Sequence, residues 1–136
     1  MGFTNRVRLR RKIRAIVPAV RRALIAQNTV NAAELVGTMK GFAPVDDGAL
    51  SASIQHQDMS DGSRISQTVT AGGATTTRPV REGQSATYDY ANAAEYGTDK
   101  MPAHPFFWVA WRLKRRRFKA RMSRAAKKAA QGAVNG

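Results

Sequence analysis

Two adjacent carboxylates are the first residues in this sequence that could do chemistry. Asp46 and Asp47 lie in the stretch GFAPVDDGALSASI, residues 41–54. A pair of carboxylates can act as general acid and general base when both reach one substrate atom. Adjacent residues on a turn rarely converge in this way, whereas an aspartate on a turn commonly accepts hydrogen bonds from nearby backbone N–H groups. We therefore interpret the pair as part of a structural turn.

The other candidate nucleophiles and metal ligands are few. His56 and His104 are the only histidines, and the chain has no cysteine, so the clustered spacing of a metal site is missing. Ser51 and Ser53 alternate with apolar residues, which is more typical of the solvent face of a strand than of a nucleophile. The sequence therefore predicts no catalytic, cofactor-binding or metal-binding residues, and a protein that is not an enzyme.

The stretch around the two aspartates is better explained as a corner between two elements. Gly41 and Pro44 are typical of a helix end, because glycine adopts the left-handed conformation after the last turn and proline cannot continue the helix. Asp46 or Asp47 can satisfy exposed backbone amides, and Gly48 permits a backbone conformation that other residues resist. The predicted corner consists of Gly41, Pro44, Asp46, Gly48 and Leu50, where a strand is expected to start.

A long amphipathic helix is predicted before this corner. Apolar residues recur at steps of three and four, the spacing of one helix face. Pro18 lies inside the pattern, so the sequence allows either one kinked helix or a separate basic arm over about residues 1–17. We favour one long, kinked helix. Its apolar stripe comprises Leu9, Ile13, Ile16, Val17, Val20, Leu24, Ala32, Leu35, Val36 and Met39.

Strand-like segments follow the corner. Apolar and polar residues alternate from Leu50 to Ile54, which is the two-residue period of a half-buried strand. Asp61 and Gly62 form a dipeptide typical of hairpin turns, and RISQTVTA, residues 64–71, is the predicted returning strand. A first hairpin is therefore expected here.

The next part of the chain is predicted to be less regular. GGATTTRPVREGQS, residues 72–85, is rich in turn-forming residues and predicts a polar loop that is mobile in the free protein and orders against a neighbour. A third short strand is expected at 87–90, followed by one or two helical turns at 91–97.

A second long helix is predicted from about residue 105. At 1.5 Å per residue, a helix of roughly 25 residues spans about 38 Å, more than a domain of this size covers, so its end over about 113–136 is expected to project. Trp111 is expected in the core and Trp108 in an exposed interface. The predicted apolar stripe comprises Phe107, Ala110, Trp111, Phe118, Met122, Ala125 and Ala129.

Together these elements predict a single α+β domain over residues 1–136. It consists of a long N-terminal helix, a small antiparallel sheet of about three to four strands with a long loop, and a long basic C-terminal helix. No segment approaches the roughly 20 apolar residues of a membrane-spanning helix. The absence of cysteine suits a reducing compartment. We expect a soluble intracellular protein.

The formal net charge of +14 is concentrated near the two ends of the chain. A charge of this size implies a polyanion or acidic protein surfaces as neighbours. We expect the basic face of the second helix to contact neighbouring subunits rather than DNA. The residues expected to make contact with a partner or DNA are Arg112, Arg115, Arg116, Arg117 and Arg121.

Two segments together resemble the neck or tail-completion (head-tail connector) protein family of long-tailed double-stranded-DNA bacteriophages. They are APVDDGALSASI, residues 43–54, and YANAAEYGTDKMPAHPFFWVA, residues 90–110. The family pattern is a helix ending in Ala-Pro-Val-Asp-Thr-Gly-x-Leu, a strand with Ser-Ile, and then Tyr-Ala, Glu-x-Gly-Thr and Pro-Phe. The matching positions are Pro44, Val45, Asp46, Gly48, Leu50, Ser53, Ile54, Tyr90, Ala91, Glu95, Gly97, Thr98, Pro105 and Phe106.

The resemblance covers about residues 10–112 and does not include the basic tail. Asp47 stands where the family usually has threonine, and Ser51 where a basic residue is common. The resemblance implies an α+β protein that forms a homo-oligomeric ring between portal and tail, through which the genome passes. No cofactor is expected. The implied partners are adaptor or head-closure proteins and tail terminator or tail-tube proteins. The implied location is the neck of the virion, with the host cytoplasm during assembly.

The resemblance also implies a set of motif and interface residues in the second segment. With the adjoining tryptophan, these are Tyr90, Glu95, Gly97, Thr98, Pro105, Phe106 and Trp108. Two other classes of function remain open. A non-sequence-specific nucleic-acid-binding protein would use the basic terminal helices on phosphates. A peripheral membrane protein would need a cleaner apolar face than the arginines around Leu113 and Phe118 leave.

Overall fold

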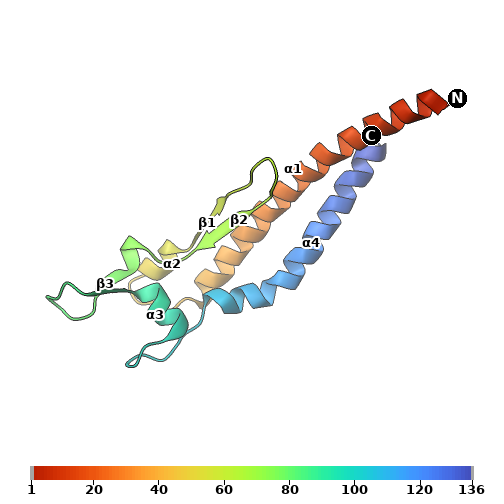
Figure 1. Ribbon diagram of the computed structural model, residues 1–136. Helices are drawn as coiled ribbons and strands as arrows, with labels where there is room; N and C mark the ends of the chain where they lie inside the picture. Colours follow the sequence, from red (N-terminus) through yellow and green to blue (C-terminus); the bar gives the residue numbers. More distant parts are fainter. Residues whose placement is uncertain (1, 136) are drawn as a thin grey trace.

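Two long helices run side by side along most of the molecule (Figure 1). The computed structural model describes residues 2–135, in which α1 spans Gly2–Phe42 and α4 spans Phe107–Asn135. Both chain ends lie at one end of this helical pair, and the smaller elements lie along α1 and at the other end. The predicted α+β class with a long helix at each end of the chain is confirmed.

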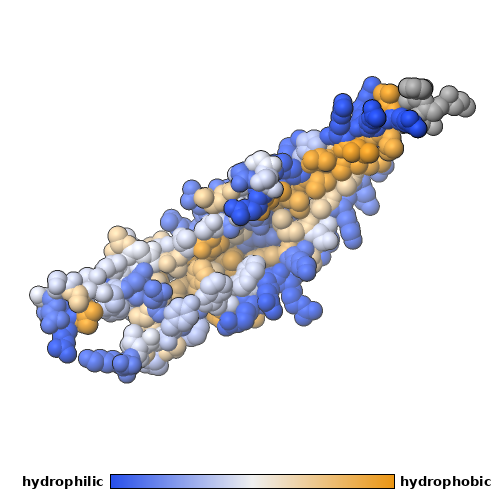
Figure 2. Space-filling view, viewed as in Figure 1, coloured by the Kyte–Doolittle hydropathy of each residue, from blue (hydrophilic) through white to orange (hydrophobic). Residues whose placement is uncertain are grey.

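The helix α1 continues through Pro18 as one element. Its apolar stripe is not buried throughout, because α1 has 41 residues and α4 has 29, so the N-terminal part of α1 extends past the end of α4 (Figure 1). Leu9, Ile13 and Val17 are each more than half exposed. Figure 2 shows apolar side chains gathered along the helical pair, flanked by hydrophilic ones. The part of α4 over 113–135 lies beside α1, so the two helices extend past the sheets as a pair.

The core lies where the helical pair meets the smaller elements. Buried side chains of both long helices join residues from the corner and from the segment before α4, so the core ties together parts of the chain that are far apart in sequence. Burial of these apolar side chains supplies most of the stabilisation of such a fold. The buried apolar cluster comprises Leu35, Val36, Met39, Ala43, Leu50, Ile54, Ala91, Ala94, Phe106, Ala110 and Phe118.

The prediction of a strand starting at Leu50 is wrong, because a short helix α2, Ala49–Ser53, occupies this position. Leu50 and Ile54 are each 2 % exposed while Ala52 is exposed. An alternating pattern of this length also fits a helical spacing of four residues, and alanine favours a helix. The strand β1 starts one residue after Ile54 and is largely polar.

The four strands form two separate antiparallel pairs rather than one sheet. The first pair joins β1, Gln55–Asp58, to β2, Gln67–Thr70, as the hairpin prediction required. The second pair joins β3, Thr77–Pro79, to β4, Thr87–Asp89. Each pair is short, so each relies on packing against the helices and the corner for its stability.

Part of the segment predicted as a polar loop, 72–85, has regular structure. A turn of 3-10 helix, η1, spans Ala74–Thr76 and leads directly into β3. Thr76 is completely buried, and its hydroxyl lies 2.6 Å from Oδ1 of Asp89. Asp89 Oδ2 also accepts a hydrogen bond from the backbone N–H of Gly73. The first half of the expected loop therefore consists mainly of η1 and β3, and β3 pairs with β4 to form a short β-hairpin.

Candidate functional site

The start of α4 is capped by a carboxylate from another helix. The helix α3, Tyr90–Tyr96, matches the predicted helical turns and carries Glu95. Glu95 Oε2 accepts hydrogen bonds from the backbone N–H groups of Phe106 at 2.8 Å and Phe107 at 2.9 Å, and Oε1 accepts one from Trp108 at 3.1 Å. The first N–H groups of a helix have no partner within the helix, and a negative charge there is also favourable. Glu95 therefore fixes α3 against α4.

Glu95 is only 8 % exposed, yet its pKa lies below the usual 4.5. Burial alone raises this pKa, but the hydrogen bonds from Phe107, Phe106 and Trp108 and the nearby charge of Arg112 outweigh burial. A general acid near neutral pH needs the opposite shift. The carboxylate thus serves the junction of the helices as an ionised acceptor.

A tight turn completes this junction. Gly97 ends α3 with a φ of 77°, and a Cβ placed there would lie 2.8 Å from the backbone N of Ala103. Both the backbone angle and the close approach require glycine. The chain then turns through a pair of backbone hydrogen bonds between Thr98 and Met101. Thr98 and Pro105 are exposed on the surface of this turn.

Arg78 connects the predicted corner to Tyr90, the first residue of α3. Its Nη1 lies 3.0 Å from Asp46 Oδ2 and its Nη2 lies 2.7 Å from Asp47 Oδ2. The guanidinium carbon of Arg78 lies 4.6 Å from the ring centroid of Tyr90, a cation–π contact. Asp47 Oδ1 accepts a hydrogen bond from the backbone N–H of Ala49, which is the main reason that its pKa is lowered. The two carboxylates therefore hold the corner.

The backbone of the corner agrees with the prediction at one glycine and not at the other. Gly48 has a φ of 82°, as expected. The prediction that Gly41 ends α1 in the left-handed conformation is wrong, because the helix continues to Phe42 and the N–H of Ala43 still donates to the carbonyl of Met39 at 2.9 Å. Pro44, which has no N–H, comes next and cannot continue this pattern.

The two long helices carry most of the positive charge. They hold every Lys and Arg of the chain except Arg64, Arg78, Arg81 and Lys100, but only one acidic residue, Glu34. Like charges at helical spacing destabilise a helix by a few tenths of a kcal/mol each. We call this pair of helices the basic hairpin.

Glu34 on α1 meets three cations of α4. Arg121 donates to its Oε2, Lys114 Nζ lies 3.2 Å and Arg117 Nη1 3.8 Å from its Oε1. Hydrogen bonds from Arg121 and then Lys114 are the main reasons that the pKa of Glu34 is lowered. Glu34 was not among the predicted site residues, although a single acid in a basic helix is a signal that could have identified it.

The remaining predicted contact arginines of α4 point elsewhere. Arg112, Arg115 and Arg116 are exposed and form no ion pair within residues 2–135. Trp108 is 45 % exposed, and its indole N–H donates to the hydroxyl of Tyr96 at 2.9 Å. Phe106 is buried at 1 % exposure and belongs to the core.

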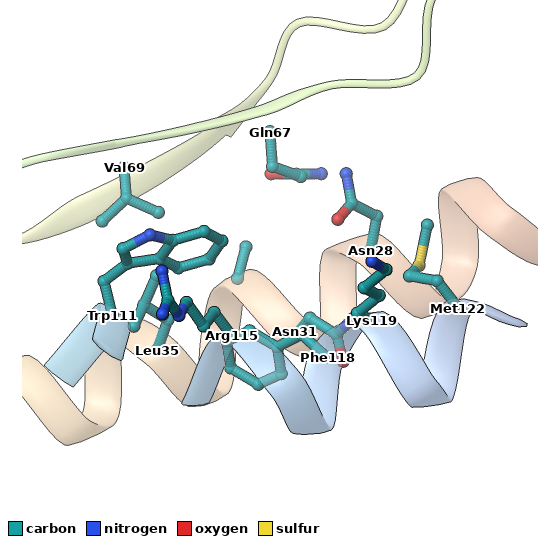
Figure 3. A pocket seen from close by; sticks show the side chains of 11 residues that line it. Asn28, Asn31, Leu35, Gln67, Val69, Trp111, Arg115, Phe118, Lys119 and Met122 are labelled. Atoms are coloured by element: carbon teal, nitrogen blue, oxygen red, sulfur yellow. The ribbon is translucent and has the colours of Figure 1, made fainter. Parts of the chain in front are cut away.

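A hollow of about 280 Å³ opens between α1, β2 and α4 (Figure 3). Val69 from β2 lies on one side of it, and Trp111 and Phe118 from α4 lie on the other. Trp111 is 39 % exposed, so the prediction that it lies in the core is wrong. Arg115 and Lys119 also line the hollow. We call this site the α1–α4 hollow.

The other sequence candidates are not brought together. His56 Nδ1 lies 3.2 Å from Oε1 of Gln67, and the hydroxyl of Ser53 accepts a hydrogen bond from the N–H of Gly72. His104 is exposed on another part of the surface. Within residues 2–135, no three His, Asp or Glu side chains are grouped as metal ligands would be. No described helix is long and apolar enough to cross a membrane.

Comparison of the chain with models of protein families, with curated proteins and with solved structures finds no match. The function is therefore inferred from the residues and contacts of this chain.

Proposed function

We propose that this chain is a structural virion protein of the bacteriophage head-tail connector, at the neck or the tail top. In this proposal it forms a homo-oligomeric ring that joins portal-side adaptor or head-closure proteins to the tail terminator or tail tube, and DNA passes through the ring. The observation that supports it most is the contact between the two segments that resemble the family. Asp46 and Asp47 in the first segment bind Arg78, which stacks on Tyr90 at the start of the second.

The motif residues have structural roles that suit an assembly protein. Glu95 caps α4, Gly97 permits the close turn after α3, and Gly48 permits the corner before α2. These contacts fix the angle between the basic hairpin and the two small sheets. A subunit of a ring needs such a fixed angle, because its two contact surfaces must keep one geometry for the ring to close.

The test is to place an early stop codon in the gene for this chain, within the genome that encodes it, and to image the resulting particles. The expected result is separate filled heads and free tails, with joined particles restored when the wild-type chain is supplied from a plasmid. A Glu82→Gln chain supplied in the same way is the control for supplying an altered chain. Glu82 is exposed and has no hydrogen bond among the described residues, so this variant should also restore joined particles. Normal joined particles in the absence of the chain would overturn the proposal.

A second candidate function is non-sequence-specific nucleic-acid binding. The observation that favours it is the basic hairpin, with its single acidic residue. Binding of this kind weakens with salt roughly in proportion to the number of phosphates neutralised. Fluorescence polarisation with a duplex of unrelated sequence, measured from low to physiological salt, tests it. Binding that persists at physiological salt, and is lost when Arg115, Arg116 and Arg117 become glutamine, would favour this second function.

A further inference from the structure

The α1–α4 hollow has the composition of a site for a protein segment. Leu35, Val69 and Phe118 supply apolar walls, while Arg115 and Lys119 supply positive charge. Neither cation forms an ion pair within the part of the chain that the structure describes. A hollow of about 280 Å³ is smaller than most sites for drug-sized molecules and suits a few side chains. Its occupant should therefore combine an apolar side chain with negative charge.

A buried amide beside this hollow lacks a partner. Asn31, which lines it, is 3 % exposed, and its Oδ1 accepts a hydrogen bond from Nε2 of Gln27 at 2.9 Å. Its Nδ2 is buried and has no acceptor among the described residues. A buried donor without an acceptor is unfavourable, and most such groups in native proteins are satisfied.

The chain carries a segment of matching chemistry at its own corner. Val45 is 90 % exposed, the largest exposed fraction among the bulky apolar side chains of residues 6–135. It is followed directly by Asp46 and Asp47, whose side chains remain 59 % exposed although both contact Arg78. An exposed valine beside two carboxylates is the complement of an apolar wall beside two unpaired cations.

The charge distribution of the whole molecule favours contact between unlike ends. The basic hairpin holds most cations, whereas eight of the nine acidic residues lie outside it. Two copies that met through their basic hairpins would place like charges together. Two copies that met corner to hollow would place negative charge on positive charge. This second contact joins different surfaces, so repeating it builds a ring wherever the rotation closes.

A chain cannot fill its own hollow with its own corner. About eleven residues of α1 separate Asn31 from Phe42, which is roughly 16 Å at 1.5 Å per residue. The corner begins beyond that point and is held there by the contact of Arg78 with Asp46 and Asp47. Contact between Val45 and the hollow therefore requires a second copy.

We propose that Val45 of one copy docks in the α1–α4 hollow of the next, with the two following aspartates against Arg115 and Lys119. The inference rests on the proposed ring for its biological role and names the subunit contact that would build it. Val45 then covers the apolar wall of the hollow.

Engineered disulfides test this contact, because the chain has no native cysteine. A Val45→Cys variant is mixed with a separate Met122→Cys variant, whose cysteine lines the hollow, at high protein concentration under oxidising conditions. A disulfide requires Cα atoms within about 7 Å, so the expected product is a cross-linked pair of the two variants. The matched control replaces Val45→Cys by Val80→Cys, another exposed valine that is not part of the corner segment. Equal yields for the two mixtures would overturn the proposal.

A charge exchange makes the test specific to the proposed partners. Adding Lys119→Glu to the Met122→Cys variant should lower the initial rate of cross-linking by about fivefold or more, because it places a carboxylate opposite the corner. Adding Asp46→Lys to the Val45→Cys variant should then restore most of that rate. An unchanged rate in the first step would show that charge does not guide this contact and would overturn the proposal.

The outcome separates this contact from the proposed function. If particles need the chain but no cross-link forms, or if Met122→Cys cross-links in particles to a different virion protein, self-docking is wrong while the connector function stands. If the cross-link forms but particles assemble without the chain, the connector function is wrong while self-docking stands. Loss of the cross-link on adding duplex DNA would assign the hollow to phosphate binding and overturn docking of the corner.

Discussion

Replacing Glu95 by glutamine tests the capped junction most directly. The substitution keeps the size of the side chain but removes its charge and one of its two acceptor oxygens. In the wild-type chain the carboxylate accepts hydrogen bonds from Phe106, Phe107 and Trp108 at 2.8, 2.9 and 3.1 Å. In the Glu95→Gln variant at least one of these N–H groups loses its acceptor, and the others bind a neutral oxygen in place of a charged one.

The expected cost follows from these three bonds. Hydrogen bonds to charged groups contribute about 1.5–3 kcal/mol each, against about 0.5–1.5 kcal/mol for neutral ones, and the helix dipole adds a few tenths of a kcal/mol. Part of the loss is recovered by rearrangement, so we expect destabilisation of roughly 2–3 kcal/mol. In a chain of this size that lowers the melting temperature by about 6–15 °C. Glu82→Gln, the same chemical change at an exposed carboxylate, should leave the melting temperature almost unchanged.

The pH dependence gives a second measure of the same bonds. Because the pKa of Glu95 is lowered in the folded chain, its stabilisation is fully present above the unfolded pKa of about 4.3 and is lost as the pH falls through the folded value. The gap in melting temperature between wild type and Glu95→Gln, followed by circular dichroism, should therefore be widest near pH 7 and narrow below about pH 4. Equal melting at pH 7, or a gap that is the same at pH 3 and pH 7, would refute this account of the junction.

Three further substitutions test other contacts by thermal melting. Gly48→Val should cost on the order of 1–3 kcal/mol through backbone strain alone, because φ is 82° and no atom lies within 4 Å of an added Cβ; unchanged melting would show that this angle relaxes freely. Gly97→Ala should cost more than Gly48→Ala, because the added Cβ also meets the backbone N of Ala103 at 2.8 Å; the reverse order would contradict the close packing of this turn. Glu34→Gln should lower the melting temperature most at low salt, because Arg121 and its neighbours lose their shared carboxylate; an effect independent of salt would point to lost packing instead.

The long helices could be predicted because their signals are long. Apolar spacing over many turns identifies a helix whatever packs against it. The same spacing could not tell which turns are buried: Leu9 and Ile13 continue the stripe of α1 but are more than half exposed, and α1 extends past the end of α4 (Figure 1). Burial depends on the partner surface, which the pattern of one helix does not contain.

The short elements were harder to predict for a physical reason. Five residues from Leu50 to Ile54 fit a strand and a helical turn equally well, so the choice depends on residues outside this window. Asp47 accepts the N–H of Ala49 at the start of α2, and Ser53 binds the N–H of Gly72 near its end. These partners lie outside the five-residue window, so local propensity could not decide the outcome.

In the candidate site, too, local features could be predicted from the sequence and distant contacts could not. Asp46 or Asp47 was predicted to accept backbone N–H groups at the corner; Asp47 accepts that of Ala49, whereas Asp46 contacts the side chain of Arg78. Its partner Arg78 was missed, since a single arginine in a polar segment has no pattern that marks it. The contact from the corner through Arg78 to Tyr90 depends on the pairing of β3 with β4; a strand was predicted at 87–90, whereas β3 lies in the segment predicted as a loop.

The basic hairpin carries a large excess of positive charge, which any function of this chain has to accommodate. Glu34 is the one acidic residue in its two helices, and three cations already share it. The exposed Arg115 and Arg116 form no ion pair among the described residues, which leaves their charge to screening by salt or to acidic groups outside their own chain. In a ring built from corner to hollow, each copy brings Asp46 and Asp47 to the cations of the next, so the acidic end of the molecule compensates the basic hairpin of its neighbour. The same arrangement leaves the arginines outside the hollow available to the acidic surfaces of adjoining connector proteins.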